Sequence, residues 1–143
     1  MTNQEMKSKV MSLGNKLAAK SADRSAAFVR AWVIVKAGGL ELAVKGTSFV
    51  NRQEALKRLA VYAPDQVRAF IVPEPENKAD PAALAVRVGV QGGRGLFTLG
   101  YVPKELTAIV AAIGARFPAI RIVSGTWGWS GKTTFGARVA LAI

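Results

Sequence analysis

The chain has 143 residues, with 20 Lys and Arg against 9 Asp and Glu, so its formal net charge is +11. It contains no His and no Cys, which excludes Ser-His-Asp and Cys-His nucleophile systems, thiolate chemistry, disulfides and Cys/His zinc sites. Carboxylates, Lys, Tyr, Ser and Thr remain as catalytic candidates, and no cofactor is expected. Hydrophobic residues make up 50% of the chain, which is typical of a folded domain rather than a disordered one.

The positive charge is concentrated at the two ends of the sequence. Residues 1–39 hold seven basic and two acidic residues, for a net charge of +5. Residues 40–90 hold seven and six, for +1, and residues 91–143 hold six and one, for +5. Each Lys or Arg laid on a phosphate releases counterions, so this balance favours a polyanionic partner, with nucleic acid as the leading candidate. A role in solubility alone is the alternative.

The sequence predicts neither a membrane span nor an export signal. The longest uncharged apolar segment covers residues 106–115, well short of the ~18 residues that a span needs. The first residues offer too short an apolar core for a secretory signal. With no Cys to oxidise, we expect a cytoplasmic location, with nucleoid association as an option, and no membrane partner.

The first 39 residues predict a basic helical hairpin. Apolar residues at spacings of three and four predict one helix over residues 3–20. A second helix follows and ends at the Gly38-Gly39 pair, with Phe28 and Trp32 one turn apart on a face expected to be buried. The composition changes at the glycine pair, which we take as the boundary between a helical extension, 1–39, and a second domain, 40–143.

The second domain predicts short strands joined by glycine-rich turns. The strands fall at residues 40–45, 66–72, 84–88, 96–101, 119–124 and 133–141. A capping box at Asn51–Glu54 starts one short helix, and Pro103 starts another. This order predicts an α+β, mostly β fold, in which an OB-like, partly open β-barrel with two short helices follows the helical hairpin.

Two segments resemble enzymatic motifs. Ser130–Thr133 imitates the end of a phosphate-binding loop, but Thr126 stands where that pattern needs glycine, so a hairpin turn explains it better. Glu74, Glu76 and Asp80 place three carboxylates within seven residues, which is a candidate Mg²⁺ site for a nuclease. The structural alternative is a rigid, proline-rich turn in which Asn77 and Asp80 bond the backbone.

Three blocks of the chain carry a further signal. They are Gly46–Glu54, a Glu-Pro-x-Asn-x-x-Asp-Pro-x-Ala-x-x-Val block within Pro73–Val86, and Leu99–Leu106. In this order they resemble the HIRAN domain family over about residues 40–143. The helical extension, with Ala31-Trp32 and Lys36, resembles a lead-in before stand-alone microbial HIRAN domains.

The resemblance implies a modified OB-like barrel that binds the free 3′-hydroxyl end of single-stranded DNA in fork-remodelling translocases. The domain itself performs no catalysis there. For this chain the resemblance implies a non-catalytic, stand-alone DNA-binding module of microbial or phage type, acting in DNA repair or replication. A helicase or nuclease subunit is a candidate protein partner.

Carried over by position, the resemblance implies a set of nucleic-acid-binding residues: Ser48, Phe49, Asn77, Asp80, Tyr101 and Lys104. The chemistry of these residues agrees with such a role. Phe49 or Tyr101 can stack on a base, and Lys104 suits a phosphate. Asp80 can accept a hydrogen bond from a 3′-hydroxyl and would repel a terminal phosphate.

The chain departs from the family pattern at three positions. Ser48 stands where end-binding members carry Arg, Lys78 replaces a usual Pro, and Ala79 replaces a usual aromatic residue. Basic and aromatic side chains elsewhere are candidates to compensate: Arg52, Lys78, Arg94 and Lys132 for charge, and Trp127 and Trp129 for stacking.

The sequence leaves three functions open. The first is recognition of single-stranded DNA near a 3′ end. The second is a metal-dependent nuclease that uses Glu74, Glu76 and Asp80. The third is an RNA or protein interaction module whose basic hairpin docks on an acidic partner while the second domain is structural.

Overall fold

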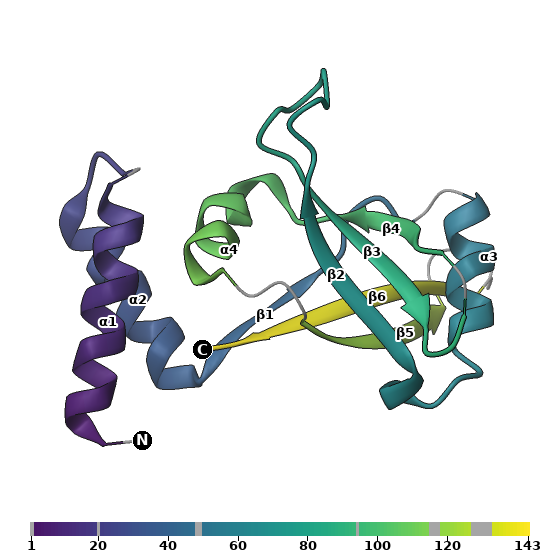
Figure 1. The fold of residues 1–143 in the computed structure, drawn as a ribbon, viewed down its shortest axis with the longest axis horizontal. Coiled ribbons are helices and arrows are strands. Elements are labelled where there is room, and N and C mark those ends of the chain that lie inside the picture. Colours follow the sequence, from purple (N-terminus) through teal and green to yellow (C-terminus); the bar gives the residue numbers. More distant parts are fainter. Residues whose placement is uncertain (1, 20, 48–49, 94, 115–117, 127–132) are drawn as a thin grey trace. The chain divides into compact units, whose positions relative to one another are not determined.

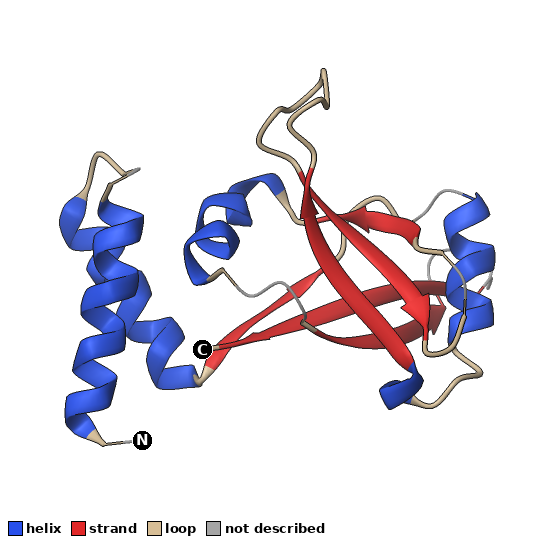
Figure 2. Ribbon diagram, viewed as in Figure 1, coloured by secondary structure: helices blue, strands red, loops and turns tan. Residues whose placement is uncertain are grey.

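The computed structural model describes residues 2–19, 21–47, 50–93, 95–114, 118–126 and 133–143. Its elements follow the predicted order (Figure 1, and by type in Figure 2). They are α1 (Asn3–Ala18), α2 (Arg24–Ala37), β1 (Gly39–Ala43), α3 (Val50–Leu59), the 3₁₀ helix η1 (Pro64–Gln66), β2 (Val67–Pro73), β3 (Leu84–Val90), β4 (Phe97–Tyr101), the 3₁₀ helix η2 (Lys104–Leu106), α4 (Thr107–Ile113), β5 (Ala119–Thr126) and β6 (Thr133–Ala142).

The chain divides into two compact units. One comprises residues 1–40, 108–115 and 141–143, and the other comprises residues 41–107 and 116–140. Of the helices in the described ranges, none is both long and apolar enough to cross a bilayer.

Helices α1 and α2 form the predicted hairpin. Thr2 and Glu5 cap α1 reciprocally, since the Glu5 amide donates to the Thr2 hydroxyl over 3.1 Å and the Thr2 amide donates to the Glu5 carboxylate over 3.2 Å. Gly38 ends α2 in the left-handed conformation, as predicted, with φ of 83°. The expectation that Trp32 is buried is wrong, because 43% of this residue is exposed. Small and branched side chains fill the α2 face instead: Ala27, Ala31, Ile34 and Val35.

Two antiparallel sheets of three strands, ordered β2-β3-β4 and β1-β6-β5, build most of the other unit. Residues alternate between buried and more exposed along β2, so one face of this sheet packs into the core and the other faces outward. Helix α3 adds Leu56 and Leu59 to the core. Helical residues outnumber strand residues in the described part of the chain. The α+β class is therefore confirmed, and the mostly β description is wrong.

A backbone bridge joins the two sheets. The Lys45 amide donates to the Tyr101 carbonyl over 2.8 Å, and the Tyr101 amide donates to the Lys45 carbonyl over 2.9 Å. Strands β2 and β5 also lie close together. Within the described ranges, however, the hydrogen-bonded strands form two separate sheets rather than a closed barrel. The comparison with an OB-like barrel stays a prediction.

Two predicted helix starts differ from the structure. Helix α3 already includes Val50, so Asn51 lies inside its first turn and its side chain accepts from the Arg52 amide over 3.1 Å. The predicted capping box at Asn51–Glu54 is therefore wrong. The segment after Pro103 begins as the 3₁₀ helix η2 and becomes α-helical only at Thr107.

Gly100 makes the bridge between the sheets possible. A side-chain methyl at this position would overlap the Lys45 carbonyl and press on Val44. We expect Gly100→Ala to lower the free energy of unfolding by about 1–3 kcal/mol, the usual cost of overpacking. Gly136→Ala is the matched control, because its methyl would meet Val123 at an ordinary 3.4 Å. Urea unfolding measures both variants, and equal stability would contradict the role given to Gly100.

Glu41 on β1 bridges two arginines of like charge. Arg121 of β5 and Arg138 of β6 lie directly opposite each other, which is a destabilising arrangement when unpaired. The Glu41 carboxylate accepts from Arg138 Nε over 2.8 Å and from Arg121 Nη2 over 3.1 Å. The hydrogen bond from Arg138 is the main cause that lowers the pKa of Glu41 below its usual 4.5.

This lowered pKa gives a prediction for stability against pH. Folding favours the ionised form of Glu41, so its contribution is present above the unfolded-state pKa and is lost as pH falls through the folded one. We expect the Tm of the wild type to exceed that of Glu41→Gln at neutral pH and the difference to shrink below about pH 4.5. Thermal melts of both proteins test this, and a difference that does not vary with pH would contradict it.

Candidate nucleic-acid interface

Asn77 organises the loop between β2 and β3. Its side-chain oxygen accepts from the amides of Ala79, over 3.0 Å, and Asp80, over 3.1 Å, while its side-chain nitrogen donates to Glu74 Oε1 over 3.3 Å. One oxygen of Asp80 accepts from the Ala82 amide over 3.0 Å. The predicted rigid turn, with backbone bonds to Asn77 and Asp80, is therefore confirmed. We call residues 74–83 the acidic loop.

Tyr101, at the end of β4, ties the acidic loop to α3. The Glu74 carboxylate lies close enough to its hydroxyl to be the main cause of a raised pKa of Tyr101. The guanidinium carbon of Arg52 lies 5.8 Å from the centre of the Tyr101 ring, in a cation–π contact. Arg52 Nη1 also donates to the Gly46 carbonyl over 2.7 Å. One guanidinium thus connects the start of α3, the segment after β1 and the end of β4.

The charges around Tyr101 act on its hydroxyl in opposite directions. The hydrogen bond to Glu74 is the main cause that raises the pKa of Tyr101 above its usual 10.0, and burial adds to it. The positive charges of Arg52 and Arg87 act in the lowering direction. Tyr101 is therefore a neutral hydrogen-bond donor, held between an acidic loop and two cations.

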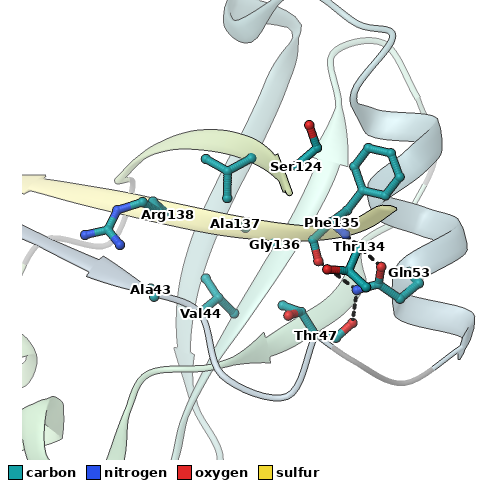
Figure 3. Close-up of a pocket in the computed structure, with 11 residues that line it drawn as sticks. Ala43, Val44, Thr47, Gln53, Ser124, Thr134, Phe135, Gly136, Ala137 and Arg138 are labelled. Atoms are coloured by element: carbon teal, nitrogen blue, oxygen red, sulfur yellow. Dashed lines mark hydrogen bonds between the residues drawn. The ribbon is translucent and has the colours of Figure 1, made fainter. Parts of the chain in front are cut away.

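Gln53 fixes the other side of α3 to β6. Its amide nitrogen donates to the carbonyls of Thr47, over 2.6 Å, and Phe135, over 2.7 Å, and its oxygen accepts from the Phe135 amide over 2.9 Å. These bonds line one wall of a pocket of about 650 Å³ between α3, β1, β5 and β6 (Figure 3). The backbone after β1 still bonds β6 at Ala137, and Gln53 takes up the backbone groups of the β6 edge further on, at Phe135.

The structure brings part of the predicted site together. Arg52 and Tyr101 are in contact, and Asn77 and Asp80 lie on the acidic loop that Glu74 joins to Tyr101. Lys78 and Lys104 are exposed, on the acidic loop and at the start of η2. The other predicted positions lie outside the described residues: Ser48, Phe49, Arg94, Trp127, Trp129 and Lys132.

The carboxylates proposed for Mg²⁺ do not form a metal site. Within the described part of the chain, no group of three or more Asp and Glu side chains is arranged to hold a metal ion. Glu74 instead accepts from Asn77 and interacts with Tyr101, and Asp80 accepts from the backbone. The nuclease hypothesis therefore has no support from the geometry of these three residues.

Sequence reasoning misses two residues of this region. It marks Glu74 only as a metal ligand, whereas Glu74 is the partner of Tyr101. It does not mark Arg87 at all, although a charged residue between Val86 and Val88 in an apolar strand is itself a signal. The Nε atom of Arg87 is buried and makes no hydrogen bond.

A basic domain with an ordered acidic loop beside clustered arginines is suited to bind a polyanion through more than charge alone. The family profile of the HIRAN domain matches residues 37–122, more than half of the chain. The chain therefore belongs to the HIRAN domain family. This membership indicates binding of nucleic acid, DNA in particular. Searches of the curated proteins and of the solved structures found no match.

The contact between Tyr101 and Glu74 can be tested by titration. We expect a step of tyrosinate absorbance above the usual pKa of 10.0, called the upper step, and its loss in Tyr101→Phe. Because folding raises this pKa, the bond's contribution to stability is full below pH 10 and is lost as pH rises through the folded value. Glu74→Gln should lower the upper step, whereas Glu76→Gln should leave it unchanged. An unchanged upper step in Glu74→Gln would contradict this contact.

Proposed function

We propose that this HIRAN domain is a non-catalytic module that binds single-stranded DNA and recognises a free 3′-hydroxyl end at the acidic loop. The observation that carries the proposal is the ordered acidic loop, held by Asn77 and joined through Glu74 to Tyr101 and Arg52. Such a site combines a local negative charge with flanking positive ones, which suits the end of a strand better than its interior.

Asp80 is the residue proposed to read the end. Its Oδ1 is used by the Ala82 amide, and among the described residues Oδ2 makes no hydrogen bond. Oδ2 can therefore accept from a terminal 3′-hydroxyl, and its charge would oppose a terminal phosphate. Asn77 acts as a positioning residue, because it holds the backbone of Asp80 in place.

Positive side chains are proposed to bind the phosphates next to the end. Lys78 and Lys104 are exposed, and the Arg52 guanidinium lies against Tyr101. Phe49, Trp127 and Trp129 stay predicted stacking residues. Lys132 stays a predicted source of positive charge, and Ser48 a predicted nucleic-acid-binding position. A role in DNA repair or replication, with a helicase or nuclease subunit as partner, belongs to the same proposal.

A comparison of end chemistry tests this function. We expect tighter binding of an oligonucleotide that ends in a 3′-hydroxyl than of the same strand with a 3′-phosphate or closed in a hairpin. Asp80→Asn should lose about tenfold of the discrimination against the 3′-phosphate, because the charge repulsion is removed. Asp65→Asn, at an exposed carboxylate on η1, is the matched control. Fluorescence anisotropy measures all affinities, and equal binding of the three ends would contradict end recognition.

A further inference from the structure

We infer that the outward face of the β2-β3-β4 sheet carries a phosphate track, marked by Arg87 and Arg68, along which single-stranded DNA runs away from the acidic loop. This inference rests on the proposed function for the position of the 3′ end. It adds a binding surface and a direction, neither of which the acidic loop supplies.

The strand register places the two arginines on one face. Arg87 lies opposite Phe70, and Arg68 lies opposite Gly89. Arg68 and Phe70 are two residues apart on β2 and alternate with the buried Val67, Ala69 and Ile71. Since cross-strand partners share a face and residues two apart on a strand do too, Arg87 and Arg68 both project outward.

Tyr101 lies on the same face and connects the track to the acidic loop. It pairs with Ala85. The β3-β4 register shifts between Val86 and Arg87, but the regular β2-β3 ladder keeps Ala85 and Arg87 on one face. Arg87 is also close enough to act electrostatically on the Tyr101 hydroxyl. The three strands lie side by side in Figure 1, with the acidic loop extending from the ends of β2 and β3. The outward face is therefore continuous with the proposed end site.

Neither arginine has its charge paired with a carboxylate of the described residues. In the described ranges, neither Arg68 nor Arg87 forms a salt bridge. Arg68 is exposed, and Arg87 is half-buried with a Nε atom that makes no hydrogen bond. Since no carboxylate of the described residues pairs with them, both guanidinium groups are suited to donate to phosphate oxygens. These features favour an anionic ligand on this face.

The register also gives the track a direction. The β2-β3 ladder meets the acidic loop at the pair Pro73 and Leu84. Arg87 is three residues along β3 from Leu84, or about 10 Å, whereas Gly89, the partner of Arg68, is five residues along, or about 17 Å. A strand with its 3′ end at the acidic loop would therefore reach Arg87 first and Arg68 only with additional nucleotides.

The test uses the full chain with Arg87→Gln and Arg68→Gln, and Arg58→Gln on α3 as the control. Affinities are measured for 3′-hydroxyl oligothymidylates of increasing length at two salt concentrations. We expect each track variant to bind long strands about tenfold more weakly. The slope of log affinity against log salt should become shallower by about 0.7 for each phosphate that is no longer neutralised. The weaker binding should appear at shorter lengths for Arg87→Gln than for Arg68→Gln, and Arg58→Gln should bind like the wild type.

The outcomes separate this inference from the proposed function. Unchanged affinity for long strands, or an equal weakening in Arg58→Gln, would overturn the track, even if the 3′-hydroxyl preference persists. If Arg87→Gln and Arg68→Gln bind long strands more weakly but the wild type shows no preference for a 3′-hydroxyl, end recognition is wrong and the arginine surface is supported. If Arg68→Gln weakens the binding of shorter strands than Arg87→Gln does, the proposed direction of the strand along the track is wrong. Arg87→Lys keeps the charge and should recover most of the affinity if Arg87→Gln folds poorly, which thermal melts report.

Discussion

The close approach of the Lys45 backbone to Gly100 is the constraint on which the site depends. The segment after β1 leaves β6 there and pairs with β4 instead. This pairing brings Gly46, and with it the Arg52 side chain, to Tyr101. Because the contact is backbone to backbone, only a residue without Cβ fits at position 100. The geometry of the interface therefore follows from packing rather than from any attraction among its charged groups.

The charged groups then divide into those that hold the structure and those that stay available. Glu41 is bonded to two arginines, and Glu74 accepts from Asn77 and interacts with Tyr101. The net charge of residues 40–90 is near zero, yet part of its negative charge is already engaged in structural contacts. The positive charge of Arg68 and Arg87 has no such partner among the described residues. The positive charge that this segment offers to a ligand on the outward face is therefore carried by Arg68 and Arg87.

The elements could be predicted well from the sequence because their signals are local. Periodic apolar residues, glycine stops and proline turns identify helices and strands without any knowledge of their neighbours. The sequence does not predict contacts between residues that are far apart along the chain. The bond from Tyr101 to Glu74 and the arrangement of Arg87 opposite Phe70 depend on strand register, which local patterns leave open. The capping box is a local signal, yet its prediction is wrong, because a four-residue motif does not fix the residue at which a helix begins.

Selectivity and affinity have separate sources in the proposed site. Four side-chain and three backbone hydrogen bonds hold the acidic loop before any ligand binds, so little ordering entropy opposes the use of Asp80. Exclusion of a terminal phosphate by one carboxylate acts only at short range and depends on that fixed position. Attraction by arginines acts on every phosphate, falls with salt and tolerates any sequence. Under the proposed function, a chain without His or Cys would need no further chemistry to prefer one kind of end, since a fixed acceptor beside a basic face would be sufficient.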